Sequence, residues 1–170
     1  MEANLLEKAY ELGHHCEKEF HGCGQCVIAA VYQIFPKMRN DDIFRSANAQ
    51  GGGMGCTSLG QCGAAVAAGM VLSQLCGRHL NEIADREKKR FKAYRLGAEF
   101  LERFTEEVGA VVCRDIQKLK MGRSFNLLDP DDWNEFERLG GHDRHCPDVV
   151  GRATRIAVQM ILEQAGLENP

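Results

Sequence analysis

The chain has 170 residues, of which 44% are hydrophobic and 26% are charged, and its formal net charge is −3 at pH 7. These values predict one globular domain over residues 1–170, long enough to bury a core. The slightly acidic balance argues against a nucleic-acid partner, and no apolar run is long enough to cross a membrane. Residues 1–15 carry charges where a signal peptide has its apolar core, so we expect a cytoplasmic protein with reduced thiols.

Helical periodicity dominates the chain, and no segment alternates as a β-strand does. We therefore predict an all-α bundle of about seven helices around a central helix of small residues. Asn40 and Asn81 are candidate N-caps, and Asp129 followed by Pro130 is a strong helix start. The predicted helices cover, in chain order, residues 2–20, 27–35, 41–48, 58–76, 82–108, 113–120, 130–139 and 146–166.

A glycine-rich turn, residues 51–55, precedes the central helix. Its glycines allow the backbone to turn tightly or to pass close to another group, and residues 62–69 are almost all small. We expect close helix packing here, with a site for a soft ligand at the N-terminal end of the helix. The alternative is a tight helix crossing in which Cys62 is only a small apolar residue. The glycines expected to contact a cofactor are Gly51, Gly52, Gly53 and Gly63.

Eight cysteines are many for a chain of this length. In a reducing compartment they favour metal binding or redox chemistry over a disulfide framework. Four lie at or near the N-terminal ends of predicted helices, where free N–H groups and the helix dipole lower a thiol pKa. If these ends converge, the thiolates form a site for zinc or an iron–sulfur cluster. Their spacing matches no short local motif, so scattered core cysteines are the alternative. The four are Cys26, Cys62, Cys113 and Cys146.

Further candidates stand beside these four. Cys23 and Cys56 are possible additional ligands, and Cys23 also forms a Cys-x-x-Cys pair with Cys26, although without the βαβ context of a redox dithiol. His145, next to Cys146, could replace a thiolate or carry a proton, and the alternative is an exposed loop histidine. The cysteines inside predicted helices are expected in the core, and they are Cys16 and Cys76.

The glycine turn 51–55, followed by Cys62–Gly63–Ala64 and flanked by the other three cysteines, resembles the C_GCAxxG_C_C family, which is associated with redox activity. The resemblance covers residues 20–165 and implies that Cys26, Cys62, Cys113 and Cys146 are the four cysteines that the family shares. The chain also resembles the non-haem part of split-Soret cytochromes, which implies an iron–sulfur centre in a helical homodimer.

Two departures from these resemblances matter. Ala67 stands where the family has a glycine, so we expect the close helix approach at Gly69 instead. The sequence has no Cys-x-x-Cys-His, so covalent haem attachment is not expected.

The sequence supports three hypotheses about function. In the first, the four thiolates hold a 2Fe–2S or 4Fe–4S cluster, and the protein carries electrons to an unidentified redox partner. In the second, the same thiolates hold structural zinc, or only pack, and the protein binds another partner. In the third, Cys23 and Cys26 exchange disulfides.

Overall fold

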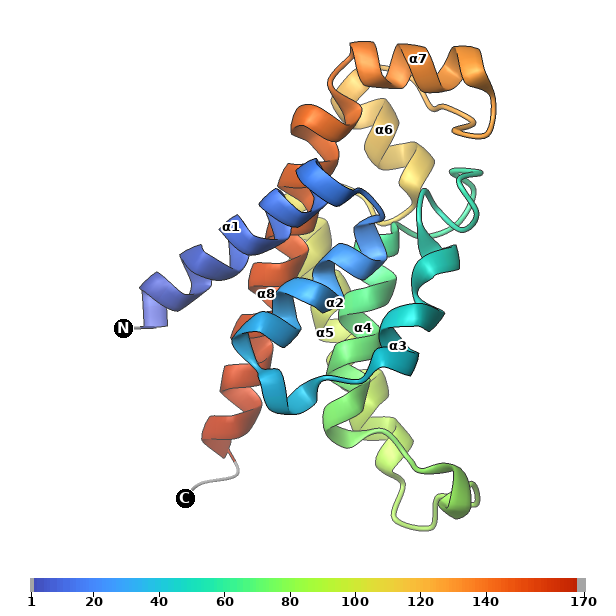
Figure 1. Cartoon of the computed structure of the whole chain (residues 1–170). Coiled ribbons are helices and arrows are strands. Elements are labelled where there is room, and N and C mark those ends of the chain that lie inside the picture. The colour runs from blue at the N-terminus through green and yellow to red at the C-terminus, as the bar shows by residue number, and fades with distance from the viewer. Residues whose placement is uncertain (1, 168–170) are drawn as a thin grey trace.

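A computed structural model describes residues 2–167, which are all-α (Figure 1). The prediction of an all-α fold is confirmed. The helices are α1 (Glu2–Phe20), α2 (Cys23–Ile34), α3 (Asp41–Ser46), α4 (Gly63–Cys76), α5 (Lys89–Val108), α6 (Cys113–Met121), α7 (Pro130–Arg138) and α8 (Cys146–Leu167). Short 3-10 turns lie at η1 (Pro36–Met38), η2 (Asn48–Gln50) and η3 (Leu80–Glu82), and a π-helical turn, η4 (Gly141–His145), leads directly into α8.

Two of the predicted N-caps are confirmed. The Asn40 side chain accepts the N–H groups of Asp42 at 3.0 Å and Ile43 at 3.1 Å and so begins α3. Asp129 does the same for the first turn of α7, where Pro130 occupies the first helical position. Side-chain oxygens thus satisfy donors that a helix leaves free at its start.

The predicted start of the fifth helix is wrong. Residues 82–88 do not continue into α5, and Asn81 does not cap it. Asp85 takes that role, because its carboxylate accepts the N–H groups of Lys89 at 2.7 Å and Arg90 at 3.3 Å. Lys88, with φ of 58°, turns the chain immediately before the helix.

The predicted starts of α2 and α4 are also displaced. α2 begins at Cys23, four residues before the predicted start at residue 27, after Gly22 turns the chain with φ of 88°. α4 begins at Gly63 and not at residue 58, because several residues between 52 and 58 have positive φ and cannot belong to a right-handed helix. Both shifts move cysteines relative to the helix ends.

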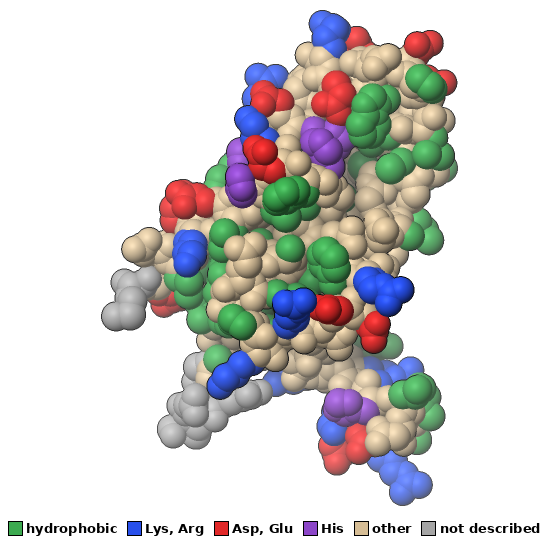
Figure 2. Space-filling view, viewed as in Figure 1, with side chains coloured by type: hydrophobic (Ala, Val, Ile, Leu, Met, Phe, Trp, Pro, Cys, Tyr) green, Lys and Arg blue, Asp and Glu red, His purple; other side chains and the backbone are tan. Residues whose placement is uncertain are grey.

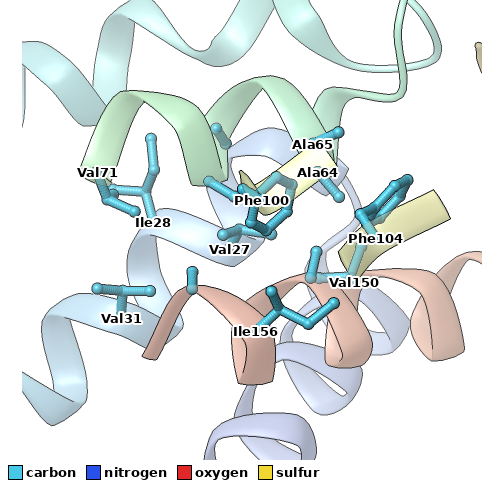
Figure 3. Close-up of a cluster of buried hydrophobic side chains, with 14 of the residues drawn as sticks. Val27, Ile28, Val31, Ala64, Ala65, Val71, Phe100, Phe104, Val150 and Ile156 are labelled. Atoms are coloured by element: carbon cyan, nitrogen blue, oxygen red, sulfur yellow. The ribbon is translucent and has the colours of Figure 1, made fainter. Parts of the chain in front are cut away.

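α4 lies in the interior, as its small residues predicted. It packs against α2, α5 and α8, and Ala64, Ala67 and Ala68 have no exposed surface. α8 is equally central, since it packs against α1, α2, α4 and α5. Figure 3 shows the apolar side chains that α2, α4, α5 and α8 contribute to this core.

Close backbone contact joins α1 to α8. A β-carbon at Gly13 would lie 2.3 Å from Thr154 Oγ1, and one at Gly151 would lie 2.7 Å from the Tyr10 ring. Only glycine permits this approach. The crossing brings the last turns of α1 to the start of α8.

Acidic and basic side chains are interspersed on the face seen in Figure 2, so no large region of this face carries charge of one sign. Within residues 2–167, no helix has both the length and the apolar character that a membrane crossing requires.

Replacing Ala67 with Leu tests the packing of α4. The added bulk has no space on this fully buried face, so we expect the free energy of unfolding in urea to fall by about 1–3 kcal/mol. Met70→Leu, a swap of similar volume at a half-buried position of the same helix, is the control and should change it by less than about 1.5 kcal/mol. Equal effects of the two variants would contradict the central position of α4.

Candidate metal-binding cavity

Five of the eight cysteines line one cavity of about 110 Å³. The last turns of α1 meet the starts of α2, α4, α6 and α8 there, and the loops before α4 and α7 close it. The volume is several times the roughly 10–15 Å³ that one water molecule needs. The cysteines are Cys23, Cys56, Cys62, Cys113 and Cys146, and the polar side chains beside them are Glu17, Gln117, Lys120, His142 and His145.

A short antiparallel contact brings Cys62 and Cys113 together. Gln61 and Val112 form an isolated β-bridge, in which the Cys62 N–H donates to Val111 O at 2.8 Å and the Cys113 N–H donates to Gly60 O at 3.0 Å. The bridge fixes the backbones of both cysteines at the starts of their helices. Figure 1 shows the loop before α4 lying next to the start of α6.

Two glycines let other chain segments approach these cysteines. A β-carbon at Gly63 would lie 2.5 Å from Gln50 O and 2.6 Å from Cys23 Sγ. At Gly53, where φ is +68°, a β-carbon would lie 2.6 Å from the Cys113 Cβ. Both positions require glycine for steric reasons. Gly63 therefore determines how closely the start of α4 meets the tip of α2.

The other glycines singled out from the sequence differ in importance. Gly52 lines the cavity. Gly51 lies outside it and has negative φ, and a β-carbon there would have only Asn48 O, at 3.7 Å, nearby. The expected close approach at Gly69 is wrong, because a β-carbon there would have nothing within 4 Å. The approach lies one and a half turns earlier, at Gly63.

Of the four predicted ligands, the structure brings Cys62, Cys113 and Cys146 to the cavity and leaves Cys26 outside it. The Cys26 thiol donates to His21 O at 3.2 Å and is hydrogen-bonded to Cys16 of α1. Cys23 takes its place in the cavity, because α2 begins at Cys23 and this residue therefore forms the tip of the helix. Whether these thiols bind a metal stays a prediction.

The expected lowering of the thiol pKa values is wrong for Cys26, Cys113 and Cys146. Burial raises the pKa of Cys113 to about 12 and raises the pKa of Cys146 well above its usual range. A hydrogen bond to Cys62, together with burial, raises the pKa of Cys23, and burial raises the pKa of Cys56. Loss of hydration thus outweighs the favourable helix N-termini. In the metal-free protein these thiols are protonated at neutral pH.

The segment before Cys146 is helical and not an open loop. Residues 141–145 form η4, and the Cys146 N–H donates to Gly141 O, so Cys146 does not cap a free helix end. The buried ring of His142 packs between Trp133 and Phe136 of α7, with centroid distances of 5.2 and 5.0 Å, and closes this side of the cavity.

His145 lines the cavity, as one reading of the sequence suggested. Its Nε2 accepts a hydrogen bond from Arg144 Nη2 at 3.2 Å, so this nitrogen already has a partner. Burial and the positive charges of Arg144 and Lys120 lower the pKa of His145.

Sequence reasoning missed a hydrogen-bond network beneath Cys113. The buried Gln117 amide donates to Ser58 Oγ at 3.0 Å and lies 3.7 Å from Cys113 Sγ, and its Oε1 accepts the Phe125 N–H at 2.9 Å. Gln117 thus ties α6 to the loops on both sides of it. No local signal marks such a residue, because its partners lie far away in the chain.

Glu17 was also missed, although the sequence carries a signal for it. Ala9, Gly13 and Glu17 are spaced by four residues and so share the buried face of α1. Glu17 is only 2% exposed, and its Oε2 has no hydrogen-bond partner. Burial, followed by the charge of Cys23, raises the pKa of this carboxyl well above its usual range.

The cavity offers the types of donor atom that a thiolate-bound metal centre uses. Thiolates suit zinc and iron–sulfur clusters, and a carboxylate can join them. As the side chains stand, no three His, Cys, Asp or Glu residues in the described part of the chain are grouped closely enough to hold one metal ion. The five cysteines instead lie around the cavity without meeting at one point.

Comparison with known proteins identifies one family. A family model with the description "Putative redox-active protein (C_GCAxxG_C_C)" matches residues 21–160, most of the chain. No curated protein and no solved structure gives a significant match.

Replacing Gly63 with Ala should disturb the cavity. The added methyl group would overlap Gln50 O and Cys23 Sγ, so we expect the free energy of unfolding to fall by about 1–3 kcal/mol and Cys23 to react faster with iodoacetamide. Gly69→Ala on the same helix has open space and should stabilise the protein by about 0.5–1 kcal/mol. Unchanged stability and labelling in the Gly63 variant would show that the close approach is not required.

Raising the pH should destabilise the metal-free protein. The folded-state pKa of Cys113 is about 12, against 9.0 for a free thiol. The unfolded chain therefore loses this proton first, and stability that is present below about pH 9 is lost as the pH rises toward about 12. Urea unfolding at about pH 8 and pH 10.5 should show this fall, and Cys113→Ser should show a smaller one. The same fall in both proteins would exclude Cys113 as its source.

Proposed function

We propose, for a chain that belongs to the C_GCAxxG_C_C family, that the cysteine cavity holds an iron–sulfur cluster through which the protein transfers single electrons. The observation that carries this proposal is that five cysteines line one cavity. The description of the family as redox-active agrees with it.

Four thiols complete the ligand set of either common cluster type. We assign Cys62, Cys113 and Cys146, as the sequence predicted, and Cys23 in place of Cys26, because only Cys23 of that pair reaches the cavity. Cys56 is a fifth cysteine that lines the cavity. Its backbone is fixed by a hydrogen bond in which the Leu127 N–H donates to Cys56 O at 3.0 Å.

The surrounding residues are suited to a redox centre. When bound, the cluster would supply one-electron chemistry at a potential that burial and hydrogen bonds to sulfur control. The Gln117 amide, 3.7 Å from Cys113 Sγ, is a donor of this kind, and the ring of His142 limits the access of water. Ligation replaces the thiol protons, so binding would release protons.

Structural zinc is the second candidate, because zinc accepts the same thiolates. Disulfide exchange at Cys23 and Cys26 is less well supported, because the two thiols have different neighbours: Cys62 for Cys23 and Cys16 for Cys26. The redox partner, the homodimer and the cytoplasmic location stay predictions.

Anaerobic purification tests the proposal. The absorption spectrum should show the broad visible bands of a cluster, bleached by dithionite, and analysis should find iron and acid-labile sulfide. Zinc alone would favour the second candidate, and no metal after anaerobic reconstitution with iron and sulfide would exclude both.

Single serine variants test the ligand set. We expect Cys23→Ser to lose most of the bound iron, because its thiol lies in the cavity, and Cys26→Ser to retain it. Cys76→Ser, in the last residue of α4 and away from the cavity, is the matched control. Iron lost from the Cys26 variant and kept in the Cys23 variant would reverse the assignment.

A further inference from the structure

The acidic side chain of the cavity, Glu17, has no role in thiolate ligation. Its side chain comes from α1, where the close crossing with α8 at Gly13 holds the helix in place. The residue is 98% buried, since only 2% of it is exposed, and Oε2 has no hydrogen-bond partner.

The basic side chains around the cavity do not neutralise this carboxyl, because each has another partner. Lys120 Nζ donates to Asp148 Oδ2 at 3.3 Å. His142 Nδ1 pairs with Glu137, and Arg144 donates to His145. The groups that act on Glu17 are the thiols of Cys16, Cys23 and Cys26, and none of them is a cation. The Cys26 thiol is hydrogen-bonded to the carboxyl but leaves Oε2 without a partner.

A buried carboxyl with an unpaired oxygen opposes folding, because it loses its hydration and gains in return only the weak hydrogen bond of the Cys26 thiol, which leaves Oε2 without a partner. An apolar side chain at this position of α1 would avoid that loss. The unpaired oxygen therefore indicates a partner that the protein chain itself does not provide. The cavity that Glu17 lines is the place for such a partner.

We propose that Glu17 is an oxygen ligand of the metal centre in this cavity, beside the cysteine thiolates. The inference rests on the proposed function only in that it requires a metal at this site. A carboxylate is an ordinary ligand of both zinc and iron, so the assignment does not depend on which metal is bound. Glu17 is then a fifth ligand beside the four assigned thiolates, and the donor set of the cavity is mixed, with sulfur and one oxygen.

Cobalt binding to the metal-free full-length protein provides the test, since Co²⁺ reports its ligands through visible absorption bands. We expect Glu17→Gln, which keeps the shape and removes the anionic oxygen, to weaken Co²⁺ binding by on the order of tenfold or more and to shift the bands. Glu19→Gln, two residues along the same helix and exposed, is the matched control and should bind as the unmodified protein does.

Stability of the metal-free protein separates a ligand from a structural residue. We expect Glu17→Met, which fills the space without a polar group, to raise the urea midpoint of the metal-free protein while it weakens Co²⁺ binding. A lower midpoint would mean that the carboxyl supports the fold, and the inference would be wrong.

The outcomes also separate this inference from the proposed function. Co²⁺ binding with thiolate bands that are identical in the Glu17 and Glu19 variants would overturn the role of Glu17 and leave the thiol site intact. A protein that binds Co²⁺ through Glu17 but takes up no iron and sulfide would retain the ligand and exclude the cluster. No Co²⁺ binding by the unmodified protein would overturn the inference together with the metal site.

Discussion

The close approach at Gly63 is the contact on which the cysteine cavity depends. Gly63 allows the start of α4 to lie against the Gln50 carbonyl and the Cys23 thiol, where a β-carbon would overlap both. The bridge between Gln61 and Val112 then holds Cys113 beside the same helix end. Backbone contacts, more than side-chain packing, therefore determine where these thiols lie. This is why cysteines far apart in the sequence can share one cavity.

Local chemistry made most of the fold predictable. The N-caps Asn40 and Asp129 and the small residues of α4 predicted helices that the structure contains. The start of α2 was not predictable, because Gly22 turns the chain there without a side-chain cap. That one turn decides whether Cys23 or Cys26 reaches the cavity. For Cys26 to join the other thiols, the first turn of α2, in which the Cys26 N–H donates to Gly22 O, would have to change.

The candidate site was less predictable than the fold, because its geometry rests on distant partners. Cys62 and Cys113 were singled out by their positions at predicted helix starts and by the family resemblance, but the bridge that pairs them has no local signature. Gln117 and Ser58 are 59 residues apart, and neither residue type predicts the buried bond between them. Glu17 is different, since its spacing from Ala9 and Gly13 placed a carboxyl on a buried face. A conflict of this kind between burial and charge is a signal of function that sequence reasoning can use.

The raised thiol pKa values and the buried carboxyl have one physical explanation. Several buried negative charges would have a high energy, and burial raises the pKa values of Cys113, Cys146 and Glu17 and so favours their neutral forms. The metal proposed for this cavity would reverse the balance, because its charge would stabilise the deprotonated ligands more than burial destabilises them. The N–H groups at the starts of α2, α4 and α6 can then stabilise the thiolates as well. Under the proposed function, metal binding would therefore be coupled to proton release, and a stable fold could carry ligands that would otherwise repel one another.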